Sequence, residues 1–215
     1  MNAQNARTPD VARRRRSMGW AVALVGAWVG ILQPPVAHAV MPPPMPMDLE
    51  VPATERLFRA GHAVGTQNYV CLPKSDGTGF EWVLYGPTAT LFSDHGRQEM
   101  THFLSPNPDE SGTPPRATWQ DSRDTSAVWA VAVESSTDPM YVAPDAIAWL
   151  KLQRVGRDRG PHGGRRLATT TWVQRLNTVG GKAPATGCAD ASNVGQRKLV
   201  PYEADYFFYK STARD

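Results

Sequence analysis

The sequence is poor in cysteine and lacks any long helical pattern. Only two of its 215 residues are cysteines, Cys71 and Cys188. No segment shows a sustained 3.6-residue repeat of apolar positions with helix caps, which argues against a helical fold. The Gly-x-Ser-x-Gly elbow of serine hydrolases is absent, and the histidines show no tight metal-binding spacing. No internal repeat is present, so repeat architectures are also excluded.

The first 39 residues predict a secretory signal peptide. Four arginines at 13–16 precede the uncharged apolar run 18–32, and Ala37-His38-Ala39 follows as a small-x-small cleavage site. The run is shorter than the roughly 20 residues of a spanning helix. The alternative to a cleaved signal peptide is an uncleaved signal anchor. Export by the twin-arginine route is less suitable, because residues 17–19 (SMG), which follow the arginines, fit such a signal poorly. We expect a secreted or periplasmic protein that meets the membrane only through this segment before cleavage.

The positive charge of the chain belongs to this N-terminal segment. The whole sequence has 23 basic and 20 acidic residues, a net charge of +3. The first 39 residues hold five arginines and one aspartate, so the remainder has 18 basic and 19 acidic residues, a net charge of −1. Basic residues are not interleaved with aromatics as nucleic-acid binding requires. We therefore expect no nucleic-acid partner.

The rest of the chain predicts one β domain. Residues 40–52 are proline-rich and predict an extended, solvated tether or a stray strand. Residues 53–215 are long enough for a single domain with its own core. The one helix candidate in this part is short, at 53–60. Runs rich in β-branched and aromatic residues predict strands at 64–72, 80–85, 88–93, 99–104, 116–120, 127–134, 147–155, 167–178 and 204–210. We predict an all-β, single-domain antiparallel β-sandwich or barrel with short helical turns.

The two cysteines are expected to form a disulfide. In an oxidising compartment an even number of cysteines favours pairing, and Cys71 and Cys188 allow only one pair. The alternative is a catalytic cysteine. The strand-like surroundings of Cys71 and the turn before Cys188 do not support it.

Two glycine-rich segments invite a functional interpretation. Gly180-Gly181 is followed by a lysine, but Pro184 blocks the helix that a phosphate-binding loop requires. We predict instead a bend of positive φ that directs the chain to Cys188. Residues 154–166 carry five arginines and four glycines. They predict either a mobile hairpin tip or a site for an anionic partner.

Catalytic candidates are few. Asp94, His95 and His102 could serve a secreted hydrolase or a metal-assisted enzyme, together with nearby carboxylates. Their spacing fits no tight metal motif, so we expect no metal ion and no cofactor.

Aromatic residues offer a second kind of site. Most tryptophans are expected in the core, but alternate positions of a strand face opposite sides, so one side can present a ligand platform. Such a platform would suit a sugar or another flat ligand. The candidate ligand-binding residues are Trp119, Tyr202, Gln174 and Asn177, with Gln67 and Asn68 as further polar neighbours.

An ordered set of motifs carries a family resemblance. It comprises residues 65–71 (GTQNYVC), Trp82, 87–96 (PTATLFSDHG), His102, Trp119, 148–150 (AWL), 174–181 (QRLNTVGG), Ala183-Pro184, Gly187-Cys188, 200–202 (VPY) and 204–206 (ADY). In these motifs the chain resembles, over residues 50–210, the secreted domain-of-unknown-function family numbered 3455 of bacteria and fungi. The resemblance implies secretion and a single domain, and it supplies no activity, cofactor or catalytic residue. The family runs from the histidine through Gly-Pro to the tryptophan within a few residues. Here residues 104–117 (LSPNPDESGTPPRA) separate His102 from Trp119, and we expect them to form an exposed loop.

The preferred function is non-catalytic binding in the cell envelope or outside the cell. The partner would be an unknown small molecule, a glycan or an envelope protein. A secreted hydrolase or metal-assisted enzyme is the first alternative, and a structural envelope component is the second.

Overall fold

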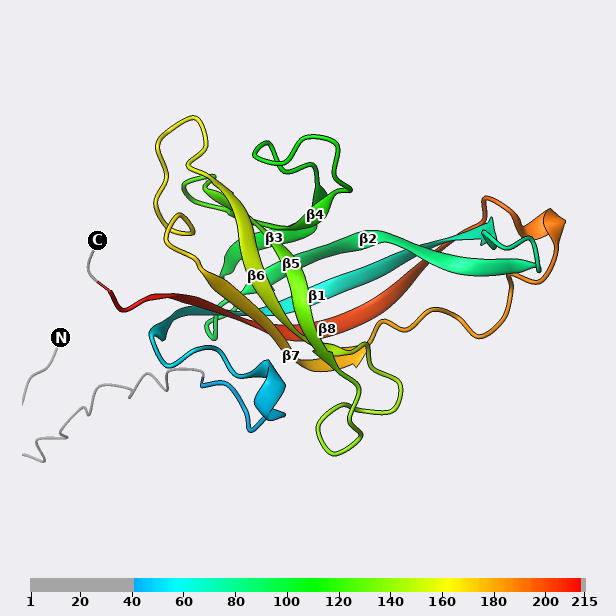
Figure 1. The fold of residues 1–215 in the computed structure, drawn as a ribbon, viewed down its shortest axis with the longest axis horizontal. Helices are drawn as coiled ribbons and strands as arrows, with labels where there is room; N and C mark the ends of the chain where they lie inside the picture. Colours follow the sequence, from blue (N-terminus) through cyan, green and yellow to red (C-terminus); the bar gives the residue numbers. More distant parts are fainter. Residues whose placement is uncertain (1–40, 214–215) are drawn as a thin grey trace, which may run out of the picture. The chain divides into compact units, whose positions relative to one another are not determined.

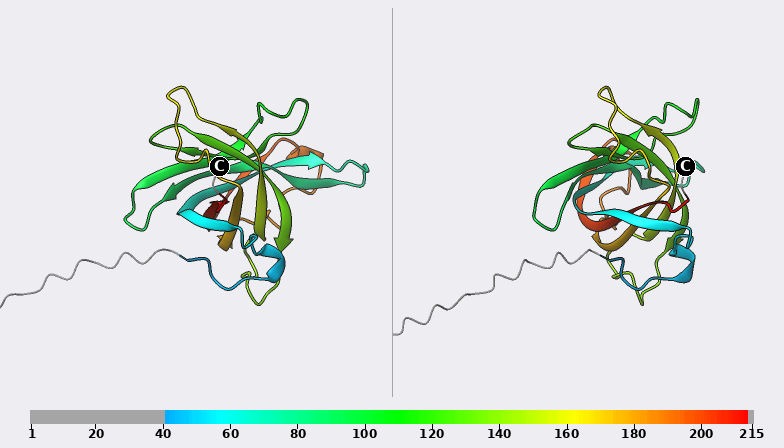
Figure 2. Two further views of the ribbon diagram at one scale, coloured as in Figure 1. Left: turned by 60° about the vertical axis from the view of Figure 1, so that its left-hand side comes forward. Right: turned by 90° about the vertical axis from the view of Figure 1, so that its left-hand side faces the viewer.

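Eight antiparallel strands close into a barrel in the computed structural model, which describes residues 41–213. The strands follow chain order around the barrel, and β8 pairs back on β1 (Figures 1 and 2). The predicted signal peptide and its cleavage point lie outside the described residues. The strands are β1 (Glu55–Pro73), β2 (Phe80–Phe92), β3 (Gln98–Ser105), β4 (Arg116–Asp121), β5 (Ala127–Ser136), β6 (Trp149–Asp158), β7 (Trp172–Gly180) and β8 (Arg197–Ser211).

The all-β prediction is confirmed, and the barrel is the form it takes. Helical structure in the described part of the chain is limited to two 3₁₀ turns, η1 (Met47–Leu49) and η2 (Ala191–Asn193). No helix among residues 41–213 is long and apolar enough to cross a membrane.

The predicted elements differ from the observed ones at three places. The helix expected at 53–60 is wrong, because Glu55 to Ala60 pair with the end of β8 and this tertiary pairing overrides local helix propensity. The strands expected at 80–85 and 88–93 are one strand, β2. Pro87 is tolerated inside it because pairing with β3 begins only at Ala89. Residues 167–171 form a turn rather than the start of β7.

Strands β1, β2 and β8 continue together beyond the barrel as an arm, which extends to the right in Figure 1. Pairing of β1 with β2 continues to Pro73 and Phe80, and pairing of β1 with β8 continues to Val70 and Arg197. No other strand pairs with this part of β2 among the described residues. The wall of the barrel therefore opens between β2 and the β3–β4 hairpin.

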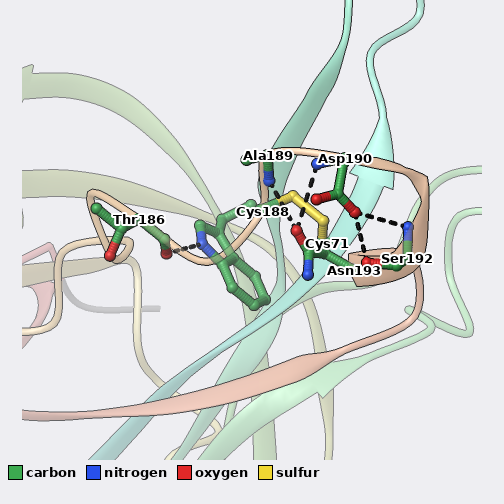
Figure 3. The surroundings of a disulfide bond; sticks show 8 residues. Cys71, Thr186, Cys188, Ala189, Asp190, Ser192 and Asn193 are labelled. Atoms are coloured by element: carbon green, nitrogen blue, oxygen red, sulfur yellow. Dashed lines mark hydrogen bonds between the residues drawn. A yellow bond between two sulfur atoms is a disulfide. The ribbon is translucent and has the colours of Figure 1, made fainter.

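The predicted disulfide is confirmed and lies on the arm (Figure 3). Cys71 is fully buried and its Cα lies 5.5 Å from that of Cys188. The Nε1–H of Trp82 donates to the carbonyl of Thr186 at 3.0 Å, which holds the segment leading to Cys188 against β2. The bond thus ties the β7–β8 connection to β1.

The predicted bend at Gly180-Gly181 is also confirmed. Both glycines have positive φ, 64° and 84°. A Cβ on Gly181 would lie 2.9 Å from the Cβ of Tyr202, closer than real Cβ contacts allow. Both the conformation and the close approach therefore require glycine.

The proline-rich segment packs on the barrel rather than lying free in solvent. Leu49 is fully buried in a cluster on the outer wall formed by β6, β7 and β8, and Met45 and Val51 pack against the same cluster. Gln174 donates from Nε2 to the carbonyl of Leu49 at 2.6 Å. The expectation of a solvated tether is therefore wrong at Met45, Leu49 and Val51, which cover apolar surface of the outer wall, whereas Met47, Asp48 and Glu50 are exposed.

Candidate functional site: a cavity inside the barrel

An ion-pair cluster lies at one end of the barrel, and its carboxylates are buried. Arg59 contacts Asp121 at 2.6 Å and Glu99 at 2.5 Å. Arg166 contacts the same Asp121 carboxylate at 3.0 Å. Burial alone would raise the pKa of Glu99, but hydrogen bonds from the arginines and their charges lower it. The arginine charges offset the cost of burying the carboxylates, so the cluster is a compensated network.

The arginine-rich segment 154–166 contributes to that end of the barrel. Arg166 belongs to the cluster, and the backbone N–H groups of Arg165 and Arg166 donate to Asp124 Oδ2 at 2.6 and 2.9 Å. Arg157 donates to the carbonyl of Ala168 at 2.8 Å. These contacts anchor the segment to the barrel. The hypothesis of an anionic partner there stays a prediction for its exposed arginines.

A cavity of about 230 Å³ occupies the interior toward the other end. Its floor is made of buried side chains, including His102, Trp119 and Tyr206. Its rim contains exposed residues, including Leu84 and Pro115. Most of the remaining lining is apolar: Pro87, Leu104, Ala117, Ala130, Val131, Ala132, Leu150 and Leu152. The space therefore runs from solvent into the barrel, in the gap between β2 and the β3–β4 hairpin.

His102 and Trp119 form the aromatic part of the floor. They are direct cross-strand partners on β3 and β4, and their rings stack with centroids 4.4 Å apart and planes 7° apart. The inserted segment 104–117 is therefore only a longer hairpin connection and leaves the pair side by side.

His102 is neutral and has a fixed tautomer. Its Nδ1 lies 2.9 Å from the carbonyl oxygen of Thr118. Because a carbonyl only accepts, Nδ1 carries the hydrogen and Nε2 is left as an acceptor. Burial lowers the pKa of His102 to about 3, against the opposing effect of the Thr118 hydrogen bond, and the nearby Arg175 cation lowers it further. The ring is uncharged at neutral pH.

Two hydrogen-bond donors in the cavity wall have no partner. Gln67 and Trp119 are 2% and 0% exposed. Among residues 41–213, four buried side-chain atoms lack a hydrogen-bond partner, and two of them, Gln67 Nε2 and Trp119 Nε1, belong to residues that line this cavity. An unsatisfied buried donor costs about 1–3 kcal/mol, so a group that accepts from these atoms would be strongly favoured.

A single cation faces the same floor. Arg175 on β7 pairs in register with Leu150 and Tyr206 and lines the cavity. Its Nε and Nη2 donate to the carbonyl of Ala148 at 3.2 and 2.9 Å. No carboxylate in the described part of the chain lies within ion-pair distance of it. Burial raises the pKa of Tyr206, and the Arg175 charge opposes that rise.

Comparison with known proteins places the chain in a family. A family model described as "Protein of unknown function (DUF3455)" matches residues 52–210. The chain belongs to the DUF3455 family. No curated protein and no solved structure matches it.

The inserted segment 104–117 shapes the rim of this DUF3455 barrel. Asn107 is buried against Gly156 of β6, where a Cβ would meet the Asn107 Oδ1 at 2.2 Å. Glu110 accepts from the Nε of Arg116 at 2.9 Å, so the charge of this rim arginine is compensated. The prediction of an exposed loop holds for most of residues 106–115, within which Asn107 is buried. It is wrong for residues 104–105 and 116–117, because they pair with each other as the ends of β3 and β4.

The predicted ligand-binding residues fall in three places of the DUF3455 barrel. Trp119 and Tyr202 are buried inside, and the Tyr202 hydroxyl lies 3.5 Å from that of Tyr206. Gln174 lies on the outer wall, where it binds the N-terminal segment and accepts from Tyr209 at 2.6 Å. Asn177 is exposed at a β-bulge, with φ of 51°, and donates to Asp205 at 2.8 Å.

The catalytic candidates are divided by the β2–β3 hairpin. Asp94 and His95 are exposed in its turn, whereas His102 is buried within the barrel. No group of three or more His, Cys, Asp or Glu side chains in residues 41–213 is arranged to hold a metal ion. The structure therefore does not bring the three candidates together.

The cavity residue that sequence reasoning did not single out is Arg175. Its strand reads as polar on both faces, in the order Gln-Arg-Leu-Asn-Thr. Only the strand register shows that Arg175 faces inward and that its neighbour Gln174 faces outward.

Proposed function

We propose that this DUF3455 chain is an exported, non-catalytic binding protein whose barrel cavity holds one small, partly apolar molecule. The observation that carries the proposal is a mainly apolar cavity whose lining residues include Gln67 and Trp119, each with a buried donor that has no partner, and the cation Arg175 without a counter-charge. Binding pockets in proteins combine apolar walls with a few convergent polar groups in this way.

The size of the cavity supports a small ligand. Its volume of about 230 Å³ is below the roughly 300–1,000 Å³ of pockets for drug-sized molecules. The apolar side chains of Leu104, Leu150 and Leu152 would cover the body of the molecule. Its polar end would meet the donors on the floor.

The lining favours binding over catalysis. It contains no aspartate or glutamate, so a paired-carboxylate mechanism has no acid or base there. His102 is the one imidazole, and a group with a pKa of about 3 is too weak a base to take a proton efficiently at neutral pH.

Export is supported by two features of the chain. The N-terminal order of arginines, apolar run and small residues is typical of a signal peptide. The Cys71–Cys188 disulfide fits an oxidising compartment. We propose a periplasmic or extracellular location.

The test uses a variant that fills the cavity. Ala117→Trp places an indole in the lining near the rim, and Ala53→Trp adds the same group at an exposed turn as the matched control. Probes are benzoate, 3-phenylpropionate and octanoate, each with its amide, followed by calorimetry and by the Nε1–H resonance of Trp119. We expect one-to-one binding that shifts this resonance, is lost in Ala117→Trp and is kept in Ala53→Trp. Absence of binding by all probes, or binding that survives Ala117→Trp, overturns the proposal.

A further inference from the structure

The charge balance inside the barrel points to the chemical class of the ligand. Resting on the proposed function, we infer that the molecule held in the cavity carries a carboxylate, which lies against the guanidinium of Arg175 while its apolar part points to the rim.

Arg175 differs from the other arginines around the interior. Arg59 and Arg166 share the carboxylate of Asp121, and Arg116 at the rim is paired with Glu110. Arg175 has only the carbonyl of Ala148 and the neighbouring Tyr206 hydroxyl. A partly buried cation without a counter-charge is costly, and an anion placed beside it removes that cost.

Most hydrogen-bonding groups of the floor are donors and favour a ligand that accepts, and the exception is His102 Nε2, which is an acceptor. Gln67 Nε2 and Trp119 Nε1 are donors without partners, and Arg175 is a donor in every orientation. A carboxylate has two oxygens with about four lone-pair sites and no donor, so it complements such a set. The guanidinium group of an arginine can donate two parallel hydrogen bonds to the two oxygens of a carboxylate.

A single negative charge fits better than two. The cavity lining has one uncompensated cation, since the rim arginine Arg116 is already paired. A dianionic phosphate monoester would leave one buried charge without a partner, which is strongly unfavourable. The remaining wall is apolar and suits a hydrocarbon body.

The depth of the groups sets the orientation of the molecule. Arg175 and Tyr206 are register partners, and the Tyr206 ring lies 5.1 Å from that of His102 and 5.3 Å from that of Trp119. The polar groups therefore gather at the buried floor. The exposed side chains, such as Leu84 and Pro115, stand at the rim. The charged head enters first and the apolar body follows.

The experiment compares each acid with its own amide at pH 7. The two probes of a pair have nearly the same shape and differ in charge, so the ratio of their affinities reports the interaction with Arg175. Hydrogen bonds to charged groups contribute about 1.5–3 kcal/mol, so we expect the acid to bind roughly ten- to a hundredfold more tightly in the wild-type protein. Arg175→Gln should reduce this ratio to near one. Arg56→Gln, which removes an exposed arginine of β1, is the matched control and should leave the ratio unchanged.

The outcomes separate this inference from the proposed function. Equal binding of acid and amide to the wild-type protein overturns the carboxylate assignment and leaves the cavity as a binding site. An acid preference that persists in Arg175→Gln also overturns it. Failure of both probes of every pair overturns the binding function itself. The comparison of acid and amide binding to the wild-type protein tests the carboxylate assignment even if Arg175→Gln does not fold. Arg175→Lys keeps the positive charge but loses the planar guanidinium, so it should retain part of the preference for acid over amide.

Discussion

Removal of the Cys71–Cys188 disulfide should destabilise the barrel without changing its cavity. The bond joins residues 117 positions apart. In the chain-entropy model, closing a loop of this length lowers the free energy of the folded state relative to the unfolded state by about 5 kcal/mol. For a domain of this size, 1 kcal/mol corresponds to about 2–4 °C in Tm, so the double variant Cys71→Ala/Cys188→Ala should unfold about 10–20 °C lower.

Urea unfolding followed by tryptophan fluorescence measures this loss. The wild-type protein treated with a reductant is the control, and its free energy of unfolding should match that of the double variant. Affinity for the cavity probes should be unchanged, because both cysteines lie on the arm and neither lines the cavity. A double variant within about 1 kcal/mol of the oxidised protein would refute the entropic reasoning.

Three further changes test other parts of the structure. Asp121→Ala should cost about 3–5 kcal/mol in urea unfolding, because two arginines lose a shared buried carboxylate, whereas exposed Asp94→Ala should change stability by less than about 0.5 kcal/mol. Burial alone would raise the pKa of Asp124, but hydrogen bonds lower it to about 2. Its contribution to stability is therefore present above its unfolded pKa, near 4, and is lost as pH falls from about 4 to about 2. In Asp124→Asn, the loss of stability between about pH 4 and pH 2 should become smaller. An acid-unfolding profile equal to that of the wild-type protein would contradict the role given to Asp124. Gly181→Ala should lower Tm clearly more than Gly77→Ala, because both have positive φ but only Gly181 lacks room for a Cβ. Equal decreases of Tm in the two variants would show that the structure makes room for a Cβ at position 181 and would contradict this reasoning.

Features that follow from local sequence patterns or from residue counts were predictable. The disulfide follows from two cysteines and an export pattern, and the bend at Gly180-Gly181 follows from paired glycines before a proline. The strands follow from β-branched and aromatic runs. Each of these signals is local or counts residues, so no knowledge of strand pairing is needed.

Features that depend on strand register were not predictable. Gln174 and Arg175 are adjacent and equally polar, yet one holds the N-terminal segment outside the barrel and the other lines the cavity. A shift of one residue in register would exchange their places. The helix expected at 53–60 failed for a related reason, since its residues find their partners in β8, about 150 positions away.

The 104–117 segment separates the two ends of the proposed site. Leu104, Pro115, Arg116 and Ala117 belong to this segment and line the cavity, and Arg116 is held by Glu110. Arg175 and Trp119 lie on other parts of the chain and line the floor. Under the proposed function, we therefore expect substitutions in the 104–117 segment to change the rates of ligand association and dissociation more than the preference for acid over amide.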